Sequence, residues 1–274
     1  MAAPSLVVFV FGILGNIVSF LVYLAPLQTF YRVYKRKSSE GFQSLPYVVA
    51  LFSAMLWMYY GLLKSEKSLL IPINAVGCTI ESLYIIIYLV YAPQPARFST
   101  VKMLLMVNVI SFGTILLSTY YLIHKASVRL TALGWICSVF SVCVFAAPLM
   151  IMRKVIRTKS VEFLPFPLSC CLTLCAVMWF FYGLLVKDYY IALPNVLGFI
   201  FGIAQMLLYV IYRNAKKDVV PVPEVALNVV DLTKLETDMD KNKKETGAPD
   251  THQIIICDGV DPAVVIVRPT ETIV

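Results

Sequence analysis

The sequence predicts an all-α integral membrane protein with seven transmembrane helices, arranged 3+1+3 as two parallel three-helix repeats and a linker helix. Three observations support this fold class. Hydrophobic residues make up 59% of the 274 positions and the mean hydropathy is +0.80, values that are typical of membrane proteins. The apolar residues fall into seven long runs, and one stretch of the chain occurs twice.

Each apolar run is about 20 residues long, which is the length that an α-helix needs to cross a hydrocarbon core of about 30 Å. The first run lacks a basic leader and is too long for the core of a signal peptide, so we expect it to remain in the mature protein. After residue 212 the chain becomes polar and charged, which predicts a disordered cytoplasmic tail over 213–274. The seven runs cover residues 6–28, 44–63, 69–91, 101–123, 130–152, 166–186 and 190–212.

The duplicated stretch runs from Lys37 to Lys64 and is written again from Lys159 to Lys187. Identical residues recur at a spacing of 122 positions, which indicates a repeated structural unit. The correspondence extends upstream and, with a slip of one residue, downstream. Matched positions include Lys37/Lys159, Trp57/Trp179, Gly61/Gly183, Gly12/Gly134, Ser19/Ser141, Val22/Val144, Asn74/Asn195 and Gly77/Gly198.

The repeat also accounts for the number of helices. Three helices cross a membrane an odd number of times, so a second triplet that followed directly would be inverted, and one additional crossing restores its orientation. We therefore expect residues 6–91 to form the first repeat, 101–123 the linker helix and 130–212 the second repeat. In transporters built from such repeats, the substrate binds near the bilayer midplane where the repeats meet.

The net charge of +7 does not indicate a nucleic-acid partner, because the basic residues lie in short clusters beside the apolar runs. These clusters are concentrated on one side of the predicted membrane. By the positive-inside rule that side is cytoplasmic, so the N-terminus lies outside and the tail inside. The poorer side carries Lys64, Lys67, Lys125, Arg129 and Lys187, and the richer side carries Arg32, Lys35, Arg36, Lys37, Arg97, Lys102, Arg153, Lys154, Arg157, Lys159, Arg213, Lys216 and Lys217.

The predicted helices lack the groups that an enzyme or a metal site needs. They contain one acid, Glu81, and no histidine, since His124 and His252 lie outside the apolar runs. No nucleophile stands beside a plausible base and no CxxC spacing occurs, so we expect no enzyme activity and no metal or cofactor. Glu81 has two open interpretations: it is the proton relay of a carrier, or an acid that is protonated or hydrogen-bonded for structural reasons.

Small and polar residues of the first span are interpreted as a packing stripe. Gly12, Gly15, Asn16 and Ser19 follow helical spacing and would let a neighbouring helix approach closely. Near the end of this span, Pro26 is expected to kink the helix, because proline removes a backbone hydrogen bond. The segment YRVYKRKSSEGF that follows is expected to form a basic loop.

Matched pairs of residues face each other across the expected two-fold axis. In each repeat a small residue and a tryptophan are four positions apart, so they project from one face of a helix. Indole rings offer flat apolar faces to a sugar ring, and asparagine amides offer a donor and an acceptor to its hydroxyls. The pattern predicts a neutral, polyhydroxylated ligand; the alternatives are that the tryptophans anchor the protein at the membrane interface and that the asparagines link helices. The pairs are Val22/Val144, Ser53/Cys175, Trp57/Trp179 and Asn74/Asn195.

Over about residues 5–213 the chain resembles the plant SWEET sugar transporters of the MtN3/saliva family. The resemblance rests on LAPLQTFYRVYKRKSSEGFQSLPYV in the first repeat and on FAAPLMIMRKVIRTKSVEFLPF and ALPN in the second. It implies four prolines at a cytoplasmic gate, an outer gate, sugar contacts and a pocket that selects substrates by size. The prolines match Pro26, Pro46, Pro148 and Pro165; the outer gate matches Tyr60, Tyr182 and Asp188; the sugar contacts match Trp57, Trp179, Asn74 and Asn195; and the pocket matches Val22, Ser53, Val144 and Cys175.

The resemblance is strongest to the sucrose-transporting branch of the family. Close relatives often have serine where this chain has Cys175, whose thiol is a weaker hydrogen-bond donor. Small side chains at the four pocket positions leave room for a disaccharide. The resemblance thus implies a facilitative, bidirectional sugar uniporter of a plant plasma membrane that works by alternating access, prefers sucrose, accepts hexoses and forms a homo-oligomer.

Two other classes stay open. A proton-coupled carrier of the wider PQ-loop type would transport another small solute through Glu81, and a protonophore would abolish its uptake. A seven-helix receptor would show no internal repeat and would usually carry an external disulfide. The sequence opposes the receptor, because six of the seven cysteines lie in the apolar runs and Cys257 lies in the tail.

Overall fold

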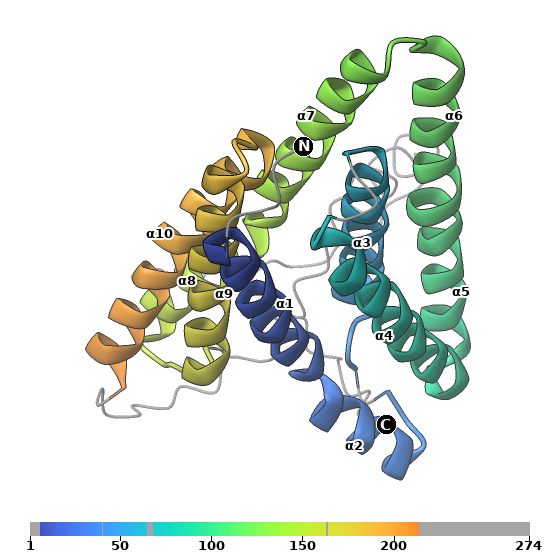
Figure 1. The fold of residues 1–274 in the computed structure, drawn as a ribbon. Helices are drawn as coiled ribbons and strands as arrows, with labels where there is room; N and C mark the ends of the chain where they lie inside the picture. The colour runs from blue at the N-terminus through green and yellow to red at the C-terminus, as the bar shows by residue number, and fades with distance from the viewer. Residues whose placement is uncertain (1–5, 40, 65–67, 163, 214–274) are drawn as a thin grey trace, which may run out of the picture. The chain divides into compact units, whose positions relative to one another are not determined.

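The structure is a computed structural model that describes residues 6–39, 41–64, 68–162 and 164–213, all of them within one compact unit of the chain (Figure 1). Every regular element in these ranges is a helix. Within the described residues, seven helical segments are long and apolar enough to cross a membrane, which confirms the predicted fold class. Apart from Arg213, the tail expected over 213–274 lies outside the described residues.

Eleven helical elements build the seven spans, because three of the spans are composed of more than one element. The first repeat consists of α1 (Leu6–Leu24), α2 (Leu27–Arg36), α3 (Leu45–Lys64) and α4 (Leu70–Tyr91). The linker span consists of α5 (Gln94–Met103), the π-helical segment η1 (Leu104–Ser111) and α6 (Phe112–Leu122). The second repeat consists of α7 (Ala126–Val144), α8 (Ala146–Thr158), α9 (Phe166–Leu185) and α10 (Tyr189–Tyr212).

In each repeat the third span packs between the other two. Helix α4 contacts both α1 and α3, and α10 contacts both α7 and α9. The repeats meet in two places, α1 against α9 and α3 against α7 (Figure 1). The first span of each repeat therefore packs on the second span of the other, as a two-fold axis between parallel repeats requires.

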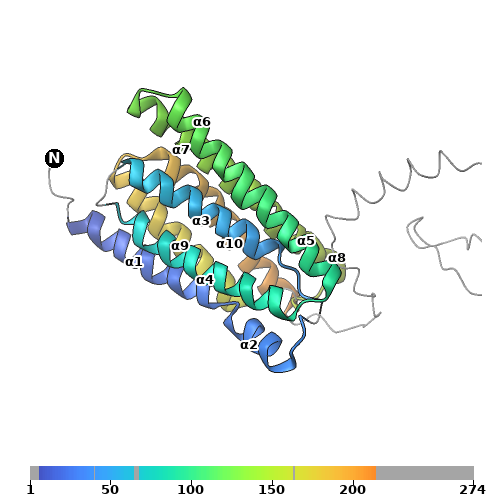
Figure 2. The same ribbon diagram turned by 90° about the vertical axis from the view of Figure 1, so that its right-hand side faces the viewer.

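The linker span lies along the outer side of α3 (Figure 2). It begins at Gln94 rather than at residue 101, because polar residues continue the helix beyond the apolar run that hydropathy detects. Its π-helical middle turns Asn108 inward, where the amide is buried. Three polar contacts hold the linker to α3 and to the residue before it: Ser44 Oγ with Thr100 Oγ1 at 2.6 Å, Asn108 Nδ2 with the Val48 carbonyl at 3.2 Å, and Tyr59 Oη with Thr119 Oγ1 at 2.9 Å.

The four predicted gate prolines all lie at helix starts. Pro26 is the N-cap of α2 and Pro165 that of α9, while Pro46 and Pro148 are the second residue of α3 and the third of α8. At these positions the missing N–H of proline interrupts no helical hydrogen bond. The kink expected at Pro26 is a break between α1 and α2, and the second repeat has the corresponding break between α7 and α8.

The two breaks are closed by different hydrogen bonds. In the first repeat, Tyr84 Oη of α4 donates to the carbonyl of Tyr23 at 2.9 Å, and the Tyr84 ring is stacked on Phe30 with ring centroids 4.4 Å apart. In the second repeat, the equivalent carbonyl of Phe145 accepts from the backbone N–H of Leu149 at 3.2 Å. A side chain of a neighbouring helix thus satisfies the carbonyl of residue 23, whereas a backbone N–H satisfies the carbonyl of residue 145.

The expectation of a basic loop is wrong for residues 31–36, which continue α2. Hydropathy missed this helix because its residues are charged, yet Phe30 and Val33 form a buried face one turn apart. Lys37 ends the helix at a φ of 54°, and its repeat partner Lys159 ends α8 at 48°. Lys37 Nζ also donates to Tyr91 Oη at 3.1 Å, a bond that raises the pKa of Lys37. We call the end of the bundle that carries α2 and α8 the basic end, and the opposite end the Asp188 end.

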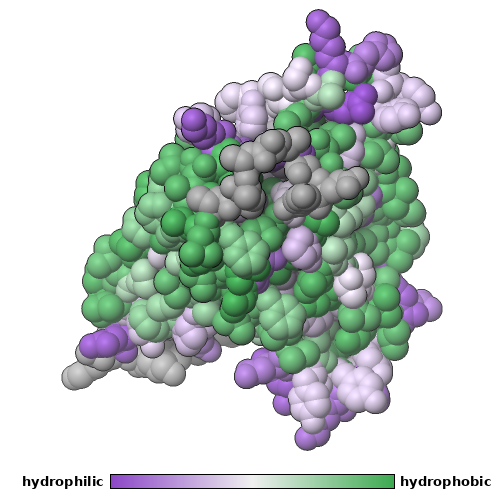
Figure 3. All heavy atoms as spheres, in the orientation of Figure 1, coloured by the Kyte–Doolittle hydropathy of each residue, from purple (hydrophilic) through white to green (hydrophobic). Residues whose placement is uncertain are grey.

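The surface of the bundle has the polarity of a protein embedded in lipid. Apolar side chains cover the middle of the face in Figure 3, and hydrophilic ones gather at its two ends. Side chains such as Leu21, Ile86 and Leu207 are more than half exposed. A water-soluble monomer would rarely expose so much contiguous apolar surface, whereas a bilayer covers it.

Candidate functional site

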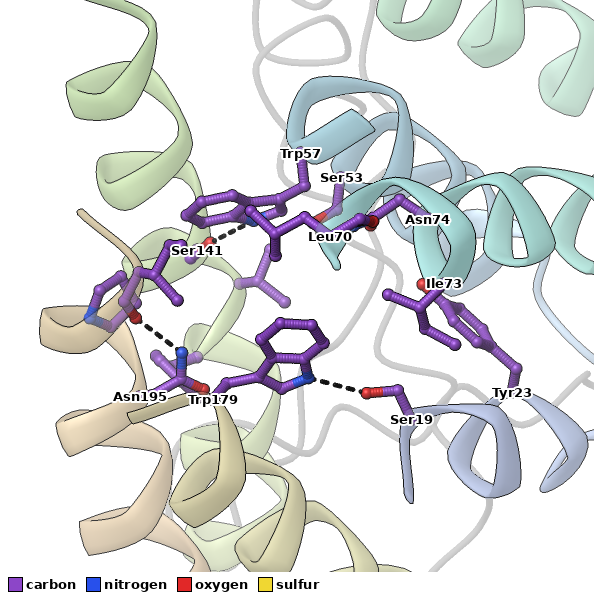
Figure 4. Close-up of a pocket in the computed structure, with 14 residues that line it drawn as sticks. Ser19, Tyr23, Ser53, Trp57, Leu70, Ile73, Asn74, Ser141, Trp179 and Asn195 are labelled. Atoms are coloured by element: carbon purple, nitrogen blue, oxygen red, sulfur yellow. Dashed lines mark hydrogen bonds between the residues drawn. The ribbon is translucent and has the colours of Figure 1, made fainter. Parts of the chain in front are cut away.

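A cavity of about 290 Å³ lies between the two repeats (Figure 4). All six spans of the repeats contribute to its wall and the linker span contributes nothing. None of the lining side chains is charged. Six of the eight predicted substrate contacts line it: Ser53, Trp57, Asn74, Val144, Trp179 and Asn195. The other lining residues are Ser19, Tyr23, Leu70, Ile73, Ser141, Phe145, Ile191 and Pro194.

The two tryptophans are held by hydrogen bonds that cross between the repeats. Trp179 Nε1 donates to Ser19 Oγ at 2.9 Å, and Trp57 Nε1 donates to Ser141 Oγ at 3.3 Å (Figure 4). Because both pairs match at the repeat spacing, the two bonds are related by the two-fold axis. Satisfying each indole N–H in this way orients the ring and leaves its flat apolar face for a ligand.

The two asparagines present oxygen atoms to the cavity. Asn74 Nδ2 donates to the Leu70 carbonyl and Asn195 Nδ2 to the Ile191 carbonyl, both at 2.7 Å and both one turn back in the same helix. Within the described chain neither Oδ1 accepts a hydrogen bond, and neither is among the fully buried atoms that lack a partner. Each amide can therefore accept a hydrogen bond from a ligand hydroxyl.

Two residues expected in the size-selecting pocket, Val22 and Cys175, are not among those that line the cavity. Cys175 contacts Ser19, which does line the cavity, with its Sγ at 3.0 Å from Ser19 Oγ. A helical pattern places Cys175 on the same face as Trp179 but cannot show that its thiol contacts a serine of another helix. Ser19 in turn was expected only to pack. Gly15 of the same stripe does pack, since a Cβ there would lie 3.1 Å from the Trp179 ring.

Four further polar or aromatic lining residues had no predicted binding role: Ser19, Ser141, Tyr23 and Phe145. The spacing of 122 residues pairs Ser19 with Ser141, and this pairing was the signal in the sequence that could have identified both serines as site residues. The same spacing also aligns Tyr23 with Phe145, but these residues differ in type. The sequence could not show that both aromatic side chains turn toward the cavity.

At the Asp188 end, the predicted gate residues Tyr60 and Asp188 meet. Tyr60 Oη donates to Asp188 Oδ2 at 2.7 Å, and Lys64 forms an ion pair with the same oxygen. Oδ1 of Asp188 caps α10 by accepting from the backbone N–H groups of residues 190 and 191. Tyr60 and Lys64 belong to α3 and Asp188 precedes α10, so this cluster ties the two repeats together. The third predicted residue, Tyr182, packs edge-on against Trp179 with ring centroids 5.3 Å apart.

Glu81 does not line the cavity. It lies on α4 with only 4% of its surface exposed, and its Oε2 has no hydrogen-bond partner in the described chain. Among the same residues, no three His, Cys, Asp or Glu side chains are grouped to hold a metal ion, and the six described cysteines are free.

The fold and the site define a class: a membrane protein of two parallel three-helix repeats that enclose a central aromatic and polar cavity. The chain belongs to the family described as "Sugar efflux transporter for intercellular exchange", whose family model matches residues 9–96 and 131–217. Each match covers one repeat. This confirms the resemblance on which the predicted family rests.

Curated relatives and a solved structure agree with this membership. Bidirectional sugar transporter SWEET13 of Oryza sativa subsp. japonica is 61% identical over 207 residues, which are 76% of this chain and 70% of the relative. Bidirectional sugar transporter N3 of Medicago truncatula is 55% identical, covering 86% of this chain and 91% of the relative. The 3.7 Å structure of a eukaryotic SWEET transporter superimposes with a TM-score of 0.71 at 33% identity, covering 76% of this chain and 97% of that one.

Proposed function

We propose that this chain is a facilitative, bidirectional sugar uniporter that works by alternating access. The observation that carries the proposal is the uncharged cavity between the repeats, whose wall combines two indole rings, two amide oxygens and several hydroxyls. Such a wall suits a neutral ligand with many hydroxyls: an ion would require a lining charge of opposite sign. The relatives reported above carry the name of bidirectional sugar transporters.

Sucrose is the proposed preferred substrate, with hexoses as further substrates. The cavity volume of about 290 Å³ is close to the lower limit of roughly 300–1,000 Å³ that small-molecule sites span. The two tryptophan rings come from different repeats, so each can pack against one ring of a disaccharide. A hexose would engage one of them and leave the other exposed to water.

Transport requires the cavity to open alternately to the two sides of the membrane. The contacts of Tyr60 and Lys64 with Asp188 close the Asp188 end, and separation of the repeats there must break them. At the basic end, the prolines at the starts of α2, α3, α8 and α9 stand where a second gate must operate. Transport involves no covalent step, because sugar binding only shifts the populations of these conformations.

In the proposed topology the basic end is cytoplasmic and the Asp188 end faces outward. Of the described charged residues, Lys35, Arg36, Arg153 and Arg157 belong to helices of the basic end, in accordance with the positive-inside rule. The proposed location is the plasma membrane, and the proposed assembly is a homo-oligomer.

Radiolabelled sucrose uptake into proteoliposomes tests the proposal. We expect Trp57→Ala and Asn195→Ala to abolish uptake, and Trp135→Ala to leave it unchanged. Trp135 is a suitable control because its side chain is 56% exposed on the outside of α7. Normal uptake by Trp57→Ala would contradict the proposed site. Uptake that requires a proton gradient and is abolished by a protonophore would instead support the proton-coupled alternative with Glu81.

A further inference from the structure

Tyr23 and Phe145 occupy equivalent positions in the two repeats, 122 residues apart, and both line the cavity. Each ring lies over a glycine of the third span of its own repeat. A Cβ at Gly77 would collide with the hydroxyl end of the Tyr23 ring, and a Cβ at Gly198 would lie 3.3 Å from Phe145 Cζ. The two glycines therefore let both rings lie close to the helix that carries the cavity asparagine, and the rings differ only in the Tyr23 hydroxyl.

That hydroxyl has no partner within the described part of the protein. No hydrogen bond of Tyr23 Oη is present, and the atom is not one of the fully buried side-chain atoms that lack a partner. The same is true of Ser53 Oγ, which also lines the cavity. At the equivalent positions the second repeat has Phe145, without a hydroxyl, and Cys175, whose thiol contacts Ser19.

Some groups of the cavity wall are therefore matched between the repeats, whereas the hydroxyl groups without a partner occur in only one repeat. The tryptophans, the asparagines and the serines that hold the indoles are matched between the repeats. The unpaired hydroxyls are not, and Figure 4 shows Tyr23 and Ser53 on the same side of the cavity as Asn74, opposite Asn195. One half of the wall thus offers two additional hydrogen-bonding groups, and the other half offers an apolar ring.

We propose that Tyr23 is a substrate-binding and specificity-determining residue, whose phenol hydrogen-bonds one sugar hydroxyl and makes an asymmetric disaccharide bind in a single orientation. The inference rests on the proposed sugar transport and adds a contact to it. A phenol can both donate and accept, so it suits a sugar hydroxyl. Phe145 supplies the apolar counterpart at the other half. A ligand that leaves the hydroxyl unpaired in the closed site loses affinity.

Tyr23→Phe tests the contact with little structural disturbance. The ring that packs on Gly77 is kept, and the bond from Tyr84 to the backbone carbonyl of residue 23 does not depend on the hydroxyl. Isothermal titration of the purified full-length chain would give dissociation constants for sucrose and for a panel of monodeoxy sucroses. We expect Tyr23→Phe to weaken sucrose binding roughly 3- to 10-fold, the net effect of one neutral hydrogen bond.

The panel separates direct contact from a structural role. In the wild-type protein, one monodeoxy sucrose should bind roughly 3- to 10-fold more weakly than sucrose because it lacks the hydroxyl that Tyr23 contacts. In Tyr23→Phe that difference should disappear, while the penalties for other positions remain. If Tyr23 served only to support its neighbours, such as Glu81 one turn beyond Gly77, every analogue would lose affinity by the same factor.

The second repeat provides the matched variant. Phe145→Tyr combined with Tyr23→Phe moves the hydroxyl across the two-fold axis. Sucrose should then bind in the reversed orientation, so its affinity should return and the same monodeoxy sucrose should again bind more weakly. Unchanged affinity and an unchanged analogue profile in Tyr23→Phe would overturn the inference while sugar transport stands. Failure of the wild-type protein to bind any sugar would overturn both.

Discussion

Asp188→Asn should open the Asp188 end of the bundle. The carboxylate uses Oδ1 to cap α10 and Oδ2 to accept from Tyr60 and Lys64. Asparagine is as good an N-cap as aspartate, so its single oxygen can keep the cap. Its NH₂ group then faces the Lys64 ammonium, which can only donate, so the ion pair with α3 is lost. The Tyr60 hydroxyl exchanges a hydrogen bond to a carboxylate for a weaker neutral one, in which it accepts from the amide.

The size of the effect follows from the burial of the partners. Hydrogen bonds to charged groups contribute about 1.5–3 kcal/mol. The Asp188 side chain is 2% exposed, but that of Lys64 is 27% exposed and partly screened by water. We therefore take the lower part of the range, about 1.5–2 kcal/mol, which corresponds to a roughly 10- to 30-fold shift toward the state that is open at this end.

Spin labels at Leu62 and Tyr189 would report the shift. Both side chains are exposed and stand at the Asp188 end, one on each repeat. In double electron–electron resonance the Asp188→Asn protein should populate a longer distance than the wild type, and Tyr60→Phe should produce a smaller change in the same direction. An unchanged distance distribution in a folded Asp188→Asn protein would refute the assignment of this cluster as a gate.

Three further predictions concern other parts of the molecule. Glu81→Gln should retain sucrose uptake, equal at pH 5.5 and 7.5 to within about twofold, because a uniporter needs no proton relay; loss of uptake by a folded variant would revive the proton-coupled alternative. Cys175→Ser should leave the ratio of sucrose to glucose uptake within about twofold, because the thiol does not line the cavity and the change keeps the side chain small. Gly134→Ala should lower stability by about 1–3 kcal/mol, because its Cβ would lie 2.6 Å from the Tyr190 ring, whereas Gly113→Ala, with open space at its Cβ, should not; thermal unfolding in detergent compares the two, and equal midpoints would contradict the packing argument.

The sequence predicted the parts of the fold that depend on apolar length and on duplication. Runs of about 20 apolar residues and a constant spacing of 122 positions require only local information, so the seven spans and the two repeats could be recognised. The helical basic segment 31–36 was missed for the corresponding reason. Its charged residues carry no apolar signal, and only its contact with α4 shows that Phe30 and Val33 are buried.

The site was predictable where one helix determines it and unpredictable where two helices must meet. The spacing of Ser53 and Trp57 places both on one face, and both line the cavity. The same spacing applied to Cys175 was insufficient, because the thiol contacts Ser19 of the other repeat and Cys175 is not among the residues that line the cavity. The partnership of Lys64 with Asp188, 124 residues apart, leaves no mark in the sequence of either segment.

The crossed bonds of Trp57 with Ser141 and of Trp179 with Ser19 have a consequence for how the molecule can be divided. Neither repeat contains the serine that accepts from its own tryptophan. A single repeat expressed alone would therefore have an indole N–H without its acceptor and only half of the cavity wall. Rotation of one repeat against the other changes both bonds together, since they are related by the same axis. The proposed binding surface thus depends on the contact between the repeats, and it changes whenever the repeats move relative to each other.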